Sequence, residues 1–168
     1  MNGDAAARDE PDEAEKALAA PVGKMETPLQ RIRREVLWRH NACRERHNLA
    51  PLKLDSRINR YSQAWAAKMA KTRKFEQSPR SARPTYQENI FMGGSSTFEM
   101  AKVNGVEIAA FFCDDMTENA MDRFVHSWNS ISTGTTELAW KTSTELGVGM
   151  ATTKQGKMDY VYICCNYS

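Results

Sequence analysis

The sequence predicts an α+β fold, in which helices pack on a mostly antiparallel sheet. In three segments the apolar residues recur about every 3.6 residues, which is the period of a helix. Segments with a period of two, which is the period of a strand, follow late in the chain. Few strand–helix–strand units are compact enough to build a parallel sheet. With 168 residues, of which 41% are hydrophobic and 26% charged, the chain is long enough for one globular domain.

The N-terminal segment 1–27 is rich in Ala, Asp and Glu and contains no aromatic residue. It carries seven acidic and three basic residues, a balance of −4, so residues 28–168 must carry +6 to give the net charge of +2. This composition predicts a disordered acidic tail, with an Ala-rich helix as the alternative. The ordered domain is therefore expected over 28–168.

The first helix is expected to begin where Thr27 serves as N-cap and Pro28 as the first helical residue. It is expected to end near Asn48, before Pro51. A periodicity of three and four residues places one set of side chains on its buried face: Leu29, Ile32, Val36, Leu37, His40 and Cys43.

The second helix is expected to begin with Asp55 or Ser56 as N-cap. Its buried stripe should be formed by Ile58, Tyr61, Trp65 and Met69. A third helix is expected to begin at Thr117. Its inward side chains should be Met121, Phe124, Val125, Trp128 and Ile131.

The C-terminal part is predicted to be an antiparallel strand pair. Val148, Met150 and Thr152 alternate, the segment "TKQGK" is typical of a turn, and "MDYVYICCNY" is apolar on both faces. Because neighbouring strand residues point to opposite faces, Cys164 and Cys165 cannot bind one metal ion together. We expect two buried thiols in a central strand, with a redox pair as the alternative.

The segment 102–107, "KVNGVE", is a candidate hairpin, because Asn-Gly suits a type I′ turn and Lys102 would face Glu107. Phe111, Phe112 and Cys113 follow it within residues 92–117. Two interpretations stay open for this region. It is either a small satellite hairpin or a lid or partner-docking surface.

Several classes of protein are excluded by the sequence. It contains no run of 18 apolar residues that could span a membrane and no apolar N-terminal segment of the signal-peptide type. Concentrated Lys/Arg runs with interleaved aromatic residues, typical of nucleic-acid binding, are missing. Four irregularly spaced cysteines favour a reducing compartment. We expect a cytoplasmic protein or one peripheral to intracellular membranes, with unconventional export as the alternative.

A series of segments resembles motifs of the CAP superfamily, which groups cysteine-rich secretory, antigen 5 and pathogenesis-related proteins. They are "HNACRERH" (40–47), "LAPLKLD" (49–55), "YQENIF" (86–91), "TGTTELAW" (133–140), "LGVGMA" (146–151) and "YICCNY" (162–167). The resemblance covers roughly residues 28–168 and is nearest in character to the leaderless Golgi-associated plant pathogenesis-related type. It implies a three-layer α-β-α sandwich and makes residues 92–117 an insertion. The residues it assigns to structural motifs are His40, Asn41, Arg44, Asn89, Trp140, Cys165, Asn166 and Tyr167.

The resemblance also implies a central cleft, lined in many members by two His and two Glu. Mapped onto this chain, those four positions hold Gln77, Glu88, Ser127 and Gly134. Only Glu88 is kept, and too few ligands remain for zinc. We therefore expect no metal, no cofactor and no catalytic residue, and a Glu88 carboxylate that accepts backbone N–H bonds and holds its loop.

These observations favour a non-enzymatic CAP-domain protein with a degenerate cleft. The partners that the resemblance implies are a sterol, an anionic phospholipid, a second copy or another protein, and nucleic acid is not among them. One alternative is a metal-dependent or Ser-based hydrolase, for which His126 and Ser127 are the only neighbouring acid–base and nucleophile pair. Another is a secreted, venom-allergen-like, immune-modulating protein that acts through residues 92–117 or the acidic tail.

Overall fold

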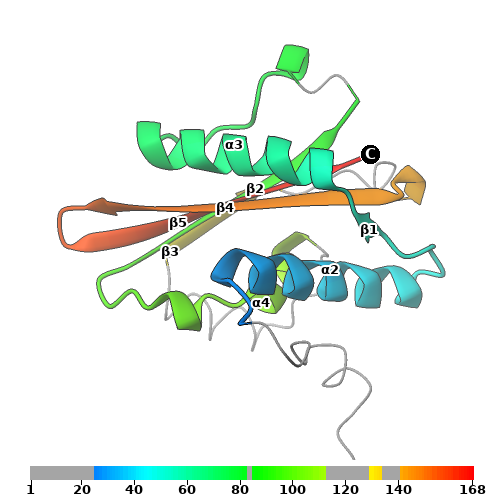
Figure 1. Cartoon of the computed structure of the whole chain (residues 1–168), viewed down its shortest axis with the longest axis horizontal. Helices are drawn as coiled ribbons and strands as arrows, with labels where there is room; N and C mark the ends of the chain where they lie inside the picture. The colour runs from blue at the N-terminus through cyan, green and yellow to red at the C-terminus, as the bar shows by residue number, and fades with distance from the viewer. Residues whose placement is uncertain (1–24, 83–84, 113–128, 134–140) are drawn as a thin grey trace, which may run out of the picture.

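The computed structural model describes residues 25–82, 85–112, 129–133 and 141–168. In these ranges three α-helices, two short 3₁₀ helices and five strands follow one another along the chain (Figure 1). The elements are α2 (Pro28–Arg46), β1 (Lys53–Leu54), α3 (Ser56–Thr72), η1 (Arg80–Ala82), β2 (Gln87–Ser95), η2 (Met100–Lys102), α4 (Gly105–Phe112), β3 (Asn129–Thr133), β4 (Glu145–Gln155) and β5 (Met158–Tyr167).

The strands form one sheet in the order β1-β4-β5-β2-β3. Every neighbouring pair is antiparallel except β1 and β4, which are parallel, so the sheet is mixed and mostly antiparallel. Helix α3 covers one face of the sheet, and α2 with α4 covers the other (Figure 1). The predicted α+β class and the α-β-α layering are confirmed. None of the helices in the described ranges is long and apolar enough to cross a membrane.

The predicted starts of the first two helices are confirmed by their caps. The Thr27 side chain accepts a hydrogen bond from the Gln30 backbone N–H, and the Gln30 side chain accepts one from the Thr27 N–H, which completes a capping box. At the start of α3, the Asp55 carboxylate accepts from the backbone N–H groups of Arg57 and Ile58. Helix α2 ends at Arg46, with His47 as its C-cap, close to the predicted Asn48.

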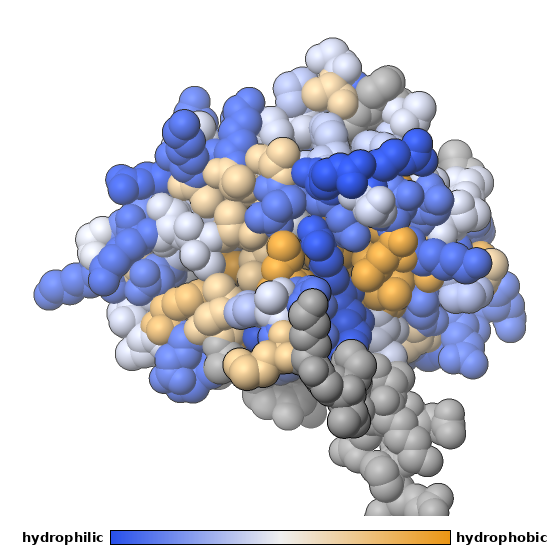
Figure 2. Space-filling view, viewed as in Figure 1, coloured by the Kyte–Doolittle hydropathy of each residue, from blue (hydrophilic) through white to orange (hydrophobic). Residues whose placement is uncertain are grey.

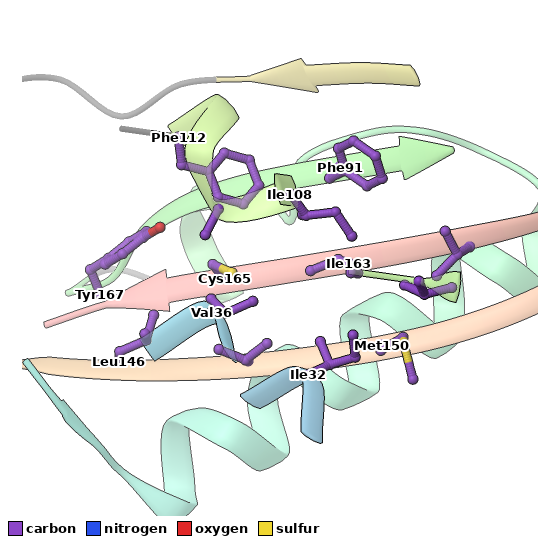
Figure 3. Packing of buried hydrophobic residues seen from close by; sticks show 14 of the residues in the cluster. Ile32, Val36, Phe91, Ile108, Phe112, Leu146, Met150, Ile163, Cys165 and Tyr167 are labelled. Atoms are coloured by element: carbon purple, nitrogen blue, oxygen red, sulfur yellow. The ribbon is translucent and has the colours of Figure 1, made fainter. Parts of the chain in front are cut away.

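The C-terminal hairpin is confirmed, with its turn at Gly156, whose φ of +63° favours glycine. Strand β5 is buried on both faces over its last seven residues. Cys164 packs with Trp65 in the cluster on the α3 side of the sheet. Cys165 packs between Val36 and Phe112 on the side of α2 and α4 (Figure 3). The predicted opposite orientation of the two thiols is confirmed, and neither cysteine is in a disulfide.

The predicted hairpin over 102–107 is wrong, because Asn104 caps a helix. Its side-chain oxygen accepts hydrogen bonds from the backbone N–H groups of Val106 and Glu107, the geometry of an N-cap. Lys102 forms an ion pair with Glu99 at 3.0 Å. Helix α4, which starts at Gly105, packs its residues Ile108, Ala109 and Phe112 against α2 in the larger core cluster.

We expect Asn104→Ala to lower the free energy of unfolding by about 1 kcal/mol, because two N–H groups of α4 lose their partner. Urea denaturation of the two proteins measures the difference. Asn104→Asp is the matched control, because it keeps the capping oxygen. Equal loss in both variants would show that the cap contributes nothing to the stability of α4.

Two further expectations need correction. Ile131, expected on the inward face of a third helix, lies in the edge strand β3, paired with Met92 of β2. The rest of that predicted helix, 117–128, lies outside the described residues. Within the supposed insertion 92–117, residues 92–95 belong to β2 and α4 belongs to the core, so this part is no satellite hairpin. That the family has no counterpart of this segment stays a prediction.

Candidate functional site

The alternation of β2 and β5 divides their polar side chains between the two faces of the sheet. Glu88 is paired in register with Asn166, and both are buried at the face covered by α3. The next residues, Asn89 and Tyr167, are buried on the side of α2. Two separate polar networks result, one around a carboxylate and one around His40.

Glu88 is only 4% exposed, and its carboxylate is held by hydrogen bonds from the loop at Ser78 and from strand β5. Ser78 donates its backbone N–H to Oε1 at 2.7 Å and its hydroxyl to Oε2 at 2.6 Å. Asn166 Nδ2 donates to Oε2 at 3.0 Å, and Cys164 Sγ lies 3.6 Å from the same oxygen. Charge-assisted bonds of this kind compensate a buried carboxylate for the loss of water.

The network extends into α3 and the loop that follows it. Tyr61 donates its hydroxyl to Ser78 Oγ at 2.7 Å, and Ser62 Oγ donates to Asn166 Oδ1 at 2.8 Å. Gln77, one of the mapped cleft positions, donates from Nε2 to the Glu88 backbone oxygen at 3.1 Å. The loop 74–79 is therefore fastened to β2 through both the side chain and the backbone of Glu88.

This geometry suits a structural carboxylate better than a catalytic one. Ser78 is adjacent to a carboxylate that could accept its proton, but it is only 2% exposed, so a substrate has no access to its oxygen. Among the described residues, no group of three or more His, Cys, Asp or Glu is arranged to hold a metal ion. Of the remaining predicted positions, Ser127 and Gly134 of the cleft, His126 and the motif residue Trp140 lie outside the described residues.

Sequence reasoning missed the hydroxyl groups in the network around Glu88. Tyr61 was expected as part of an apolar stripe, yet its hydroxyl is bonded within the network. Ser62 and Ser78 were not singled out, although both are buried. The available signal was weak: a helix face with one serine among apolar residues, and a serine directly after the mapped Gln77. A buried Ser is recognised only when its partner is known.

The second network centres on His40, which is fully buried beneath α4. His40 Nδ1 lies 2.8 Å from the Val36 carbonyl oxygen and must donate to it. Nε2, 2.8 Å from the Tyr167 hydroxyl, then accepts the tyrosine proton, while Asn89 Nδ2 donates to the same hydroxyl at 3.2 Å. A neutral imidazole fits this chain of donors and acceptors, and His40 thereby joins α2 to β5 and β2.

Burial lowers the pKa of His40 from 6.5 to about 4, and the nearby Arg44 and Arg39 add to this shift. Below pH 6.5, His40 therefore binds a proton in the unfolded chain but stays neutral in the folded chain. The free energy of unfolding falls as the pH drops toward 4. We expect a loss of about 3 kcal/mol over this window from His40 alone. The midpoint of urea denaturation, followed from neutral to acidic pH, measures this loss of stability.

The control for this prediction is the exposed His47 on the same helix. His47→Gln should keep the acid sensitivity, whereas His40→Gln should reduce it, whatever its stability at neutral pH. If the two variants keep identical pH profiles, the buried imidazole is not the group that destabilises the fold in acid.

Other motif residues also hold segments together. Asn41 exchanges two hydrogen bonds with the backbone of Leu52, at 2.8 and 3.1 Å. Buried Arg44 donates to the carbonyl oxygens of Ala50 and Ser143, which joins the turn after α2 to the segment before β4. Burial raises the pKa of the Cys165 thiol, so this cysteine is no thiolate nucleophile.

A second candidate site is the outward face of α3, defined by Arg57, Arg60, Ala64, Ala67, Lys68 and Lys71 and called here the α3 face. All six residues are exposed, and their spacing places them within a stripe about 100° wide. Residues 56–75 include six basic and no acidic residues. In Figure 2, hydrophilic side chains project from the layer of α3 with paler residues between them.

The α3 face has two further properties. Asp55 is the acidic residue at its start, but that carboxylate caps the helix and lies 3.8 Å from the Arg57 guanidinium. At the other end, Arg73 donates to the backbone oxygen of Lys154 at 3.4 Å, which brings the β4–β5 turn with its basic residues to the end of α3. Positive charge therefore continues along the helix, because residues 56–75 contain no acidic side chain.

Comparison with known proteins agrees with this architecture. Residues 37–167 match the model of the family described as "CAP: Cysteine-rich secretory protein family". The chain belongs to the CAP family. The human (Homo sapiens) Golgi-associated plant pathogenesis-related protein 1 is 30% identical over 125 residues, which span 73% of this chain and 74% of that protein. The resemblance inferred from the motifs is thereby confirmed.

Two solved structures share the CAP fold at lower sequence identity. BmVAL-1 aligns with a TM-score of 0.54 at 20% identity, over 89% of this chain and 81% of that one. NaASP2, solved with Zn2+, aligns with a TM-score of 0.50 at 20% identity, over 89% and 84%. At this level of identity the likeness concerns the fold, and the zinc ion belongs to NaASP2.

Proposed function

We propose that this chain is a non-enzymatic CAP-domain protein that binds anionic membrane surfaces through the α3 face. The observation that carries the proposal is the unbroken positive charge of an exposed helix face with alanines between the cations. Lys and Arg near an anionic leaflet contribute about 1 kcal/mol each to binding. Small side chains between them let the helix lie close to a flat surface.

The assignment as a non-enzymatic protein rests on the state of Glu88. Its carboxylate is occupied by Ser78, Asn166 and Cys164 and is screened from solvent. A general base needs access to the proton it removes, and Glu88 has none. The name of the human relative associates that protein with the Golgi, and we extend a peripheral location on intracellular membranes to this chain.

A charge-neutralising pair of substitutions tests the binding surface. Lys68→Gln with Lys71→Gln should weaken binding to phosphatidylserine-containing vesicles about 30-fold, because about 2 kcal/mol of attraction is lost. Wild-type binding should also fall steeply with added salt. Co-sedimentation with vesicles, with pure phosphatidylcholine vesicles as the reference, measures both effects.

The matched control removes two exposed cations elsewhere, with Arg46→Gln and Lys102→Gln. It leaves the net charge equal to that of the test variant. Binding close to wild type supports docking through the α3 face. If both double variants weaken equally, net charge alone governs the interaction and the α3 face is not the docking surface. Absence of binding by wild type at low salt rejects the membrane proposal altogether.

A further inference from the structure

Two of the six prolines directly follow a hydroxyl residue, giving the dipeptides Thr27-Pro28 and Ser78-Pro79. A Ser or Thr followed by Pro is the minimal sequence that proline-directed protein kinases accept. The two dipeptides are equivalent as sequence motifs, but the exposure of their hydroxyl residues differs in the folded protein.

Thr27 is exposed and its backbone is extended, with φ −71° and ψ 155°. Proline at the next position favours this extended conformation of Thr27. Ser78, by contrast, is 2% exposed, and its hydroxyl is bonded to Glu88 and Tyr61. Of these two hydroxyl groups, that of Thr27 is the one exposed at the surface.

The surroundings of Thr27 also suit the product. Its Oγ1 already accepts a hydrogen bond from the Gln30 N–H at 3.2 Å, at the start of the 19-residue helix α2, whose first turn has no acidic side chain. The residue before it, Glu26, is held by Arg34 through two bonds of 2.9 Å. Among the described residues, the third guanidinium nitrogen of Arg34, Nη1, has no hydrogen-bond partner, although the side chain as a whole is 24% exposed.

We propose that Thr27 is a phosphorylation site for a proline-directed kinase and that its phosphate caps α2. In the transfer, Thr27 Oγ1 bonds to the γ-phosphorus of ATP while the bond from that phosphorus to the β-bridging oxygen breaks. The hydroxyl proton passes to the general base of the kinase, and ADP leaves. The phosphate oxygens then accept from the first-turn N–H groups of α2.

This inference is independent of membrane binding. Helix α2 and the α3 face lie on opposite sides of the sheet (Figure 1), and charges separated by more than a Debye length of about 8 Å are largely screened at physiological ionic strength. Phosphorylated protein should therefore bind vesicles as the unmodified protein does. A failure of either proposal leaves the other standing.

The test is phosphorylation of the full folded chain by a proline-directed kinase with ATP, with peptide mass mapping of the product. We expect one phosphate on Thr27, none on Ser78, and complete loss of incorporation in Thr27→Ala but not in Thr27→Ser. Phosphate on Ser78, or none on wild type while a standard substrate is fully converted, overturns the site.

A second readout tests the cap itself. In the phosphorylated chain the Gln30 amide proton resonance should move downfield, because its hydrogen bond becomes charge-assisted. The Asp55-capped amide of Ile58 in α3 is the internal control and should not move. An unmoved Gln30 resonance overturns the capping geometry. Protein purified from its source cells should carry the same modification at Thr27 and not at Ser78.

Discussion

Gly149→Ala is expected to lower the free energy of unfolding by about 3–5 kcal/mol, a large share of the stability of a typical domain. Helix α3 lies directly on the backbone of β4 at this point. A Cβ atom on Gly149 would meet the backbone of Ser62 and Gln63 at separations below 3.0 Å, which real Cβ atoms essentially never show. Neither partner is a flexible side-chain end, so a helix or a strand must move.

The movement would also break hydrogen bonds across the contact. Gln63 accepts from the Met150 N–H at 2.9 Å and donates to the Met150 carbonyl oxygen at 2.7 Å. Asn59 accepts from the Val148 N–H at 2.8 Å. These side chains satisfy the outer edge of β4 beyond the short strand β1, and each net bond contributes about 1 kcal/mol. The destabilisation caused by overpacking and that caused by the lost hydrogen bonds therefore add.

Gly156→Ala is the matched control for this prediction. Gly156 has a positive φ of 63° but nothing within 4 Å of the position a Cβ would take. It should cost only about 1 kcal/mol, from backbone strain alone. Urea denaturation of both variants decides the matter. A Gly149→Ala protein no less stable than Gly156→Ala would mean that α3 is not seated on the β4 backbone.

Glu88→Ala is expected to be comparably destabilising, by about 3 kcal/mol or more. The substitution removes the carboxylate that accepts hydrogen bonds from the Ser78 N–H, the Ser78 hydroxyl and the Asn166 amide. These buried donors then lose this acceptor. Glu88→Gln should be milder but still unfavourable, because its amide group is a donor that faces other donors.

Exposed Glu76, in the same loop, supplies the control, and Glu76→Ala should leave the denaturation curve unchanged. Vesicle binding by folded Glu88→Gln should equal that of wild type, because the carboxylate lies beneath α3 and not on its outward face. Near-normal stability of Glu88→Ala would exclude the structural role. A hydrolytic activity that wild type shows and folded Glu88→Gln lacks would contradict the assignment as a non-enzymatic protein.

Much of the architecture was predictable from local sequence. The caps at Thr27 and Asp55 depend on residues within one helical turn, so the chain nearby contains all the necessary information. The orientation of Cys164 and Cys165 follows from the two-residue period of a strand whatever else the fold does. The CAP motifs added the layering, since each marks a place where distant segments meet.

The tertiary structure alone decided the features that depend on distant partners. Asn104-Gly105 suits both a type I′ turn and a helix start, and burial of Ile108 and Phe112 against α2 selects the helix. Ile131 fits a helical stripe, yet pairing with β2 places it in a strand. The bonds that occupy Glu88 come from Ser78 and Asn166, 10 and 78 residues away, and no local pattern encodes such contacts. Periodicity therefore determined which face of an element is buried, whereas the identity of its partner required the folded chain.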